Sequence, residues 1–151
     1  MKIIGLFFLL SITVYCQTKV SINPGLKFGL AFGEKVQFVF GYELSVVFYR
    51  HGSNEDYRYG IVFDYDKIDD VKRLHVGFEY MYRFVGVDIG PTFGWKESKL
   101  HYGFSLIPFG GAFFLPYINY THFKEINDQL DLGTYFKIPI PLSKERFSLA
   151  G

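Results

Sequence analysis

The chain is poor in cysteine and has no large excess of charge of either sign. Among its 151 residues there is one cysteine, Cys16, and the formal net charge is +1. A single cysteine forms no disulfide within the chain. If Cys16 is removed with a signal peptide, the mature protein has no thiol nucleophile and no thiolate metal ligand. No stripe of clustered basic residues is present, so the composition gives no reason to expect nucleic-acid binding.

Aromatic residues, in contrast, make up 21% of the chain, with 18 phenylalanines and 12 tyrosines but one tryptophan. Phenylalanine and tyrosine both favour strands. No amphipathic helical period is present after the first 16 residues. A length of 151 residues indicates one domain, and the composition therefore predicts a single all-β domain.

The N-terminal segment has the pattern of a secretory signal peptide. Lys2 precedes an apolar run that ends at Val14. That run is too short to cross a bilayer as a helix, which needs about 20 residues. Val14 and Cys16 fit the −3 and −1 positions of a cleavage site, so we predict a signal peptide over 1–16 and a mature domain over 17–151. Lipidation of Cys16 remains the alternative.

Apolar and polar residues alternate through most of the mature chain. Within 35–50, one face carries Val36, Phe38, Phe40, Tyr42, Leu44, Val46 and Phe48, while the other carries Lys35, Gln37, Gly41, Glu43 and Ser45. Successive side chains of a strand point to opposite faces, so such alternation indicates two-faced strands. We predict eight of them, at 20–32, 35–50, 57–66, 73–84, 85–95, 100–106, 112–123 and 130–138. A reversal of phase places the start of the fifth at Val85.

Proline affects the prediction for one turn and for one strand. Pro108 to Gly111 is predicted to be a turn, since proline and glycine interrupt regular structure. The strand over 112–123 keeps two possible phases, because Pro116 interrupts its alternation.

The predicted strands have the length and polarity of a membrane barrel. At about 3.3 Å per residue and a tilt near 45°, the apolar run from Val36 to Phe48 rises roughly 28 Å. The lipid-facing band of an outer-membrane barrel is about 25 Å tall. The expected fold is therefore an all-β, antiparallel, up-and-down transmembrane β-barrel of about eight strands, with a polar, charge-paired lumen.

The polar faces of the strands then supply an interior network. Its predicted members are Lys27, Glu43, Arg58, Asp64, Asp66, Arg73, Glu79, Arg83, Asp88, Asp131 and Lys137. With Lys96, these residues provide six cations and six carboxylates. A balanced set of charges suits a closed interior, whereas an ion-selective pore favours an excess of one sign.

The whole pattern resembles the small eight-stranded outer-membrane barrels of Gram-negative bacteria, the OmpA/OmpX-like group. The last strand adds a local match, because Asp131-x-Gly133-x-x-Phe136-x-Ile138 is similar to the signal read by the barrel insertion machinery. The resemblance implies an outer-membrane location and contact with outer-membrane lipid and lipopolysaccharide. It also implies a structural or interaction role, with no catalysis, no wide pore and no cofactor.

One motif suggests an enzyme instead. His51-Gly52-Ser53-Asn54 resembles the His-x-Ser-Asn motif of the lipid A 3-O-deacylases, which are also outer-membrane barrels. That resemblance implies His51 as base, Ser53 as nucleophile and Asp64 or Asp66 as the acid that orients the histidine. The simpler interpretation is a loop, since glycine, serine and asparagine are common in turns.

Two further alternatives follow from the composition. A secreted soluble carrier of the lipocalin type would also be a β-barrel, but it needs an apolar interior and a polar exterior. His75, His101 and His122 are spread over different predicted strands, and a metal site needs converging ligands. We therefore predict no metal site.

Overall fold

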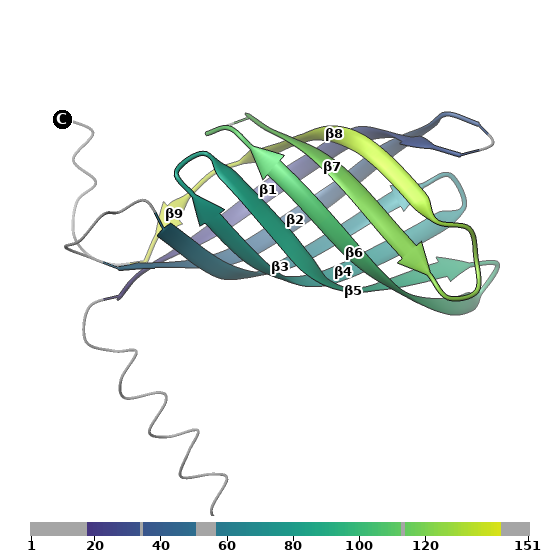
Figure 1. Cartoon of the computed structure of the whole chain (residues 1–151), viewed down its shortest axis with the longest axis horizontal. Helices are drawn as coiled ribbons and strands as arrows, with labels where there is room; N and C mark the ends of the chain where they lie inside the picture. The colour runs from purple at the N-terminus through teal and green to yellow at the C-terminus, as the bar shows by residue number, and fades with distance from the viewer. Residues whose placement is uncertain (1–17, 34, 51–56, 113, 143–151) are drawn as a thin grey trace, which may run out of the picture.

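The chain forms a closed barrel of eight long antiparallel strands (Figure 1). The computed structural model describes residues 18–33, 35–50, 57–112 and 114–142. The predicted signal peptide over 1–16, including Cys16, lies outside the described residues. The strands are β1 (Thr18–Phe32), β2 (Gln37–Arg50), β3 (Tyr57–Ile68), β4 (Val71–Tyr82), β5 (Val85–Lys96), β6 (Lys99–Gly110), β7 (Phe114–Phe123), β8 (Gln129–Lys137) and the short β9 (Ile140–Pro141).

Consecutive strands are neighbours all the way round, and β1 closes the sheet by pairing with both β2 and β8. β9 extends this closing seam, because Ile140 pairs with Ile22 of β1. A closed sheet has no free edge strand, so the ladder leaves no exposed row of backbone groups. The predicted all-β, eight-stranded antiparallel barrel is confirmed. The described part of the chain holds no helix long and apolar enough to cross a membrane.

Tight turns join the strands at one end of the barrel. Asp69 has φ 52° between β3 and β4, and Glu97 and Ser98 have φ 50° and 63° between β5 and β6. In the β5–β6 turn, positive φ at both Glu97 and Ser98 gives a twist that matches that of the flanking strands. At the opposite end, Arg83 with φ 53° lies in the turn that separates β4 from β5. The predicted start of the fifth strand at Val85 is confirmed.

The predicted turn from Pro108 to Gly111 is wrong in its first three residues. β6 continues to Gly110, and Pro108 pairs with Val87 of β5. The chain reverses at Gly111 instead, whose φ of 117° suits glycine. Proline remains in a strand where its missing N–H is not needed by a neighbour.

The structure also resolves the phase of the seventh strand. Along β7 the buried side chains are Leu115, Tyr117, Asn119, Thr121 and Phe123. The alternate positions, including Pro116 and Ile118, are exposed. Pro116 pairs with Thr134 of β8, so the strand passes through this proline without a change of phase.

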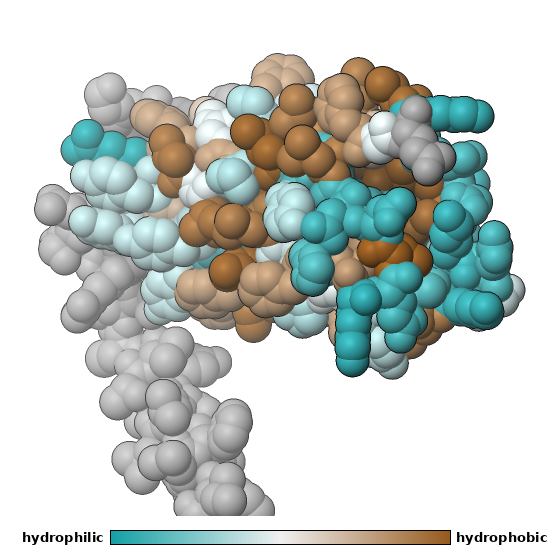
Figure 2. Space-filling model, turned by 45° about the vertical axis from the view of Figure 1, so that its right-hand side comes forward, coloured by the Kyte–Doolittle hydropathy of each residue, from teal (hydrophilic) through white to brown (hydrophobic). Residues whose placement is uncertain are grey.

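Apolar side chains cover the outside of the barrel. Among the described residues, exposed large hydrophobic side chains outnumber buried hydrophobic ones by more than two to one. They form a brown wall in Figure 2, while hydrophilic residues gather at the end that carries the tight turns. Buried apolar residues form two small groups. One contains Ile107, Phe109, Leu115, Tyr117 and Tyr135, and the other Ala31, Val39 and Ile68.

Close packing of β1 on β8 requires a pair of glycines. Gly29 lies directly opposite Gly133, and a Cβ atom at Gly29 would lie 2.6 Å from the Tyr117 hydroxyl and 2.7 Å from the Leu132 carbonyl oxygen. The Tyr117 hydroxyl therefore occupies space that a side chain at either glycine would need.

We expect Gly29→Ala to lower the free energy of unfolding by about 1–3 kcal/mol, the usual cost of forcing extra atoms into a packed interior. Gly33→Ala is the matched control. A Cβ atom there meets nothing within 4 Å, so its effect should stay within about 0.5 kcal/mol. Urea unfolding of the two variants, followed by tryptophan fluorescence and circular dichroism, measures both. Equal stability of the two variants would contradict the packing of Tyr117 on the glycine pair.

Candidate functional site

The strands bring most of the predicted polar residues together inside the barrel. Nine of them are buried, and they are Lys27, Glu43, Asp64, Asp66, Arg73, Glu79, Asp88, Asp131 and Lys137. Arg58 and Arg83 are exposed, so their predicted interior positions are wrong. Arg58 is the second residue of β3, where the strand meets the end of the barrel. Arg83 lies in the β4–β5 turn, with its guanidinium carbon 5.4 Å from the centre of the Tyr82 ring.

The predicted balance of six cations and six carboxylates is also not found. Lys96, the remaining predicted cation, is only half-buried at the end of β5. Among the described residues, the buried set contains six carboxylates but three lysine and arginine side chains. Each of these cations lies between two carboxylates, as follows.

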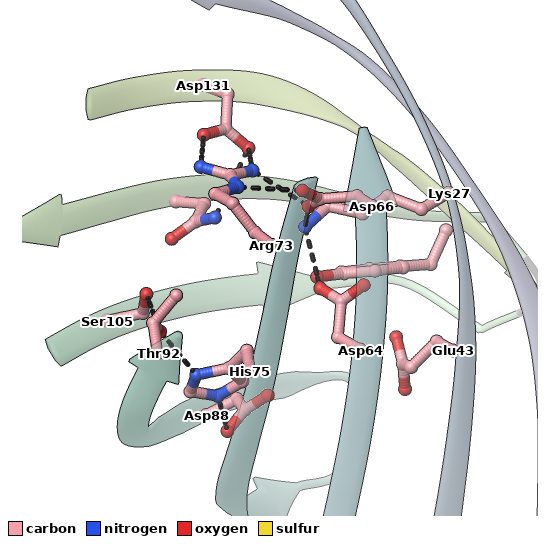
Figure 3. A network of polar contacts seen from close by, with 12 residues as sticks. Lys27, Glu43, Asp64, Asp66, Arg73, His75, Asp88, Thr92, Ser105 and Asp131 are labelled. Carbon is pink, nitrogen blue, oxygen red and sulfur yellow. Dashed lines mark hydrogen bonds and ion pairs between the residues drawn. The ribbon is translucent and has the colours of Figure 1, made fainter. Parts of the chain in front are cut away.

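Lys27 binds two aspartates of β3. Its Nζ atom lies 2.6 Å from Asp64 Oδ2 and 2.6 Å from Asp66 Oδ2 (Figure 3). Lys27 is 0% exposed. A buried ammonium group without such partners would be very costly, so the two carboxylates make its burial possible.

Arg73 connects β4 with β3 and β8. Its Nε and Nη2 atoms each donate to Asp66 over 2.7 Å, which makes a bidentate pair, and Nη1 donates to Asp131 Oδ1 over 2.9 Å. Bidentate arginine–carboxylate pairs are among the strongest charge-assisted hydrogen bonds. Asp66 is thus shared by Lys27 and Arg73. The five residues of this continuous ion-pair group are Lys27, Asp64, Asp66, Arg73 and Asp131.

Lys137 forms a second ion-pair group. It pairs with Glu43 of β2 and, over 2.8 Å, with Glu79 of β4. Lys137 and Glu79 come from opposite sides of the closed sheet, because three strands separate β8 from β4 in either direction round the barrel. The interior ion-pair network, defined as Lys27, Glu43, Asp64, Asp66, Arg73, Glu79, Asp131 and Lys137, therefore ties five strands together.

Neutral donors make up for the small number of interior cations. The Tyr135 hydroxyl donates to Asp64 over 3.0 Å, and the Asn119 amide donates to Asp131 over 3.2 Å. Neither Tyr135 nor Asn119 was predicted as a member of the network. Their inward positions in the alternation of β8 and β7 were the available signal, but alternation does not tell which inward residues meet.

A third polar group contains an acid, a histidine and hydroxyls in series. His75 Nε2 lies 3.0 Å from Asp88 Oδ1, and His75 Nδ1 lies 3.0 Å from Thr92 Oγ1. The Thr92 hydroxyl continues to Ser105 over 2.5 Å and from there to Thr121 over 2.7 Å. This order resembles that of a catalytic triad. However, Thr92 is 2% exposed and its oxygen is already shared with Ser105, so the group has no access for a substrate and acts as internal packing.

An exposed polar cluster fastens the β7–β8 loop. The Tyr120 hydroxyl donates to Asp128 over 2.5 Å, and His122 Nδ1 lies 2.7 Å from the other oxygen of that carboxylate. These hydrogen bonds, with that of Tyr120 the larger influence, lower the pKa of Asp128 below its usual value. The cluster is solvated, and its role is to hold the loop against the strand end.

Of the predicted deacylase residues, the structure describes only the two candidate acids. His51 and Ser53 lie outside the described residues. Asp64 and Asp66, the acids assigned to orient the histidine, are engaged by Lys27 and Arg73 in the interior. In the described ranges, no group of three or more histidine, cysteine, aspartate or glutamate side chains is arranged to hold a metal ion.

We expect Arg73→Met to cost about 3–5 kcal/mol of stability, because it leaves Asp66 and Asp131 buried without their shared cation. The adjacent outward-facing change Lys72→Met is the control, and it should stay within about 0.5 kcal/mol. Lys72 is exposed on the same strand. Urea unfolding of both variants provides the comparison, and a small effect of Arg73→Met would show that the network does not hold the strands.

No known protein family model, curated protein or solved structure matches this chain. The barrel and its polar groups are therefore interpreted from their own geometry.

Proposed function

We propose that the chain is a small integral outer-membrane β-barrel with a structural or interaction role, without a catalytic centre or a wide pore. The observation that carries the proposal is the apolar outer wall. Phe38, Tyr42, Leu44, Phe63 and Phe104 are between 44% and 62% exposed. In water such a continuous apolar surface would drive association, whereas lipid is a suitable solvent for it.

Strand length and interior polarity support the same proposal. A transmembrane strand needs about 9–11 residues, and β2 to β6 have between 12 and 14. A closed barrel satisfies its backbone groups within the sheet, as lipid requires. The eight charged residues of the interior ion-pair network are buried inside the barrel, away from the wall. A soluble carrier requires the reverse distribution, so the exposure pattern does not favour it.

The proposed partners are outer-membrane lipid, lipopolysaccharide and the barrel insertion machinery. The turn end of the barrel carries exposed lysines, among them Lys67, Lys72 and Lys99, which suit anionic headgroups. The segment that resembles the insertion signal lies in β8 and ends one residue beyond it, and its Phe136 and Ile138 side chains are exposed. β8 is also the strand that closes the barrel on β1.

Membrane fractionation combined with heat-modifiability tests this proposal. We expect the protein in the outer-membrane fraction, with a band on a detergent gel that shifts on boiling, because a closed barrel resists detergent until it is heated. A soluble protein without a shift would overturn the proposal.

A lysine scan of the outer wall tests it more sharply. Leu44 lies in the middle of β2 and Leu100 is the second residue of β6, at the turn end of the barrel, and both are exposed. In vesicles, Leu44→Lys should cost about 2–4 kcal/mol, as expected at the bilayer midplane, and Leu100→Lys about 0–1 kcal/mol. Equal and small costs at the two positions, measured by urea unfolding from vesicles, would mean that water surrounds the wall.

A further inference from the structure

Two lysines lie on the outer wall at the turn end of the barrel. Lys67 is the last outward residue of β3 and Lys72 is the first outward residue of β4, and both are exposed. Among the strand residues whose side chains the structure describes, the outward positions hold no other lysine, arginine, aspartate or glutamate. The charge on the wall is therefore concentrated at one place.

The two lysines are directly opposite each other, since Lys67 pairs with Lys72 in the register of β3 and β4. Directly opposite residues of antiparallel strands have Cβ atoms about 4.5–5.5 Å apart, and like charges in that position destabilise the sheet. The pair becomes favourable when one anion accepts charge-assisted hydrogen bonds from both ammonium groups.

The described part of the chain supplies no such anion. Within it, neither Lys67 nor Lys72 takes part in an ion pair or a side-chain hydrogen bond. The nearest acids in the sequence are Asp69 and Asp70 of the turn, and Asp69 instead accepts a hydrogen bond from Gln37 over 3.0 Å. Both ammonium groups are therefore available to a ligand.

Aromatic side chains flank the lysine pair on both sides. Phe40 of β2 is opposite Lys67, and Trp95 of β5 is opposite Lys72. Phe40 is 38% exposed and Trp95 is 37% exposed. Further along β3 and β4, the outward positions are aromatic or aliphatic. A molecule at this place meets cations at the rim of the wall and apolar groups next to them, which suits a lipid with an anionic head.

A second pair of opposed lysines lies at the same end of the barrel but on the other face of the sheet. Lys96 pairs with Lys99 across the β5–β6 turn. These two residues share the inward phase of the buried Gly94 and His101. The chain thus offers a control pair with the same charge and the same register, turned away from the wall.

We propose that Lys67 and Lys72 together bind the phosphate of an anionic membrane lipid, with Phe40 and Trp95 against the adjoining part of its acyl chains. The inference rests on the proposed function, because only a barrel in a bilayer holds lipid headgroups beside this wall. A lysine close to an anionic lipid surface contributes about a fivefold gain in affinity. A free phosphate ion satisfies the same ammonium groups but gains nothing from the aromatic residues.

Quenching of Trp95 by lipids with brominated acyl chains measures the selectivity of the pair. Trp95 is the only tryptophan and lies opposite Lys72, so its emission reports on lipid beside the lysines. The protein is reconstituted in phosphatidylcholine vesicles that contain a minor fraction of brominated phosphatidic acid or, in parallel, of brominated phosphatidylcholine. The ratio of the two quenching effects gives the preference for the anionic headgroup.

We expect the unaltered protein to prefer phosphatidic acid, and Lys67→Gln or Lys72→Gln to lower that preference about fivefold. The double control variant, with Lys96→Gln and Lys99→Gln, should retain it. Equal quenching by the two lipids in the unaltered protein overturns the lysine site and leaves the membrane barrel intact. No quenching of Trp95 by either lipid removes the membrane function and the lysine site together.

Two further outcomes also contradict the assignment. An equal loss of preference in the control variant would mean that the general charge of the turn end attracts the lipid. Removal of the preference by inorganic phosphate, where sodium chloride of equal ionic strength does not remove it, would make the pair a site for free phosphate.

Discussion

The pairing of buried charges is the constraint on which the rest of this structure depends. The outer wall is apolar, so the closed sheet directs its ionic side chains into an interior that excludes bulk water. Lys27, Arg73 and Lys137 each lie between two carboxylates. Unpaired charges in that place would cost several kcal/mol each. Closure of the sheet meets this requirement, because it brings the partners from β1, β2, β3, β4 and β8 together.

The same network explains how a barrel with few buried apolar residues is held in one shape. The two buried apolar groups are small. Ion pairs and hydrogen-bonded hydroxyl groups fill much of the rest of the interior, with Gly29 and Gly133 leaving room for Tyr117.

Much of the fold was predictable from alternation because a strand has a simple period. The eight strands, the reversal of phase at Val85 and the inward positions of Lys27, Asp64 and Arg73 all follow from it. The turn predicted from Pro108 to Gly111 was wrong, because proline is compatible with a strand whose neighbour needs no hydrogen bond from it. Arg58 and Arg83 were misplaced because alternation does not tell where a strand ends and its inward face meets solvent.

The sequence by itself determined which side chains face inward and which face outward, since that choice depends only on the two-residue period of a strand. It therefore also determined the apolar wall and the polar interior. Only the tertiary structure decided which inward residues meet, because the contacts join strands far apart in the chain, as in the pairing of Arg73 with Asp131. It also decided that five of the six buried carboxylates share three lysine and arginine side chains, while Asp88 meets His75. These outcomes depend on closure of the sheet and on the approach of backbones, which no local pattern contains.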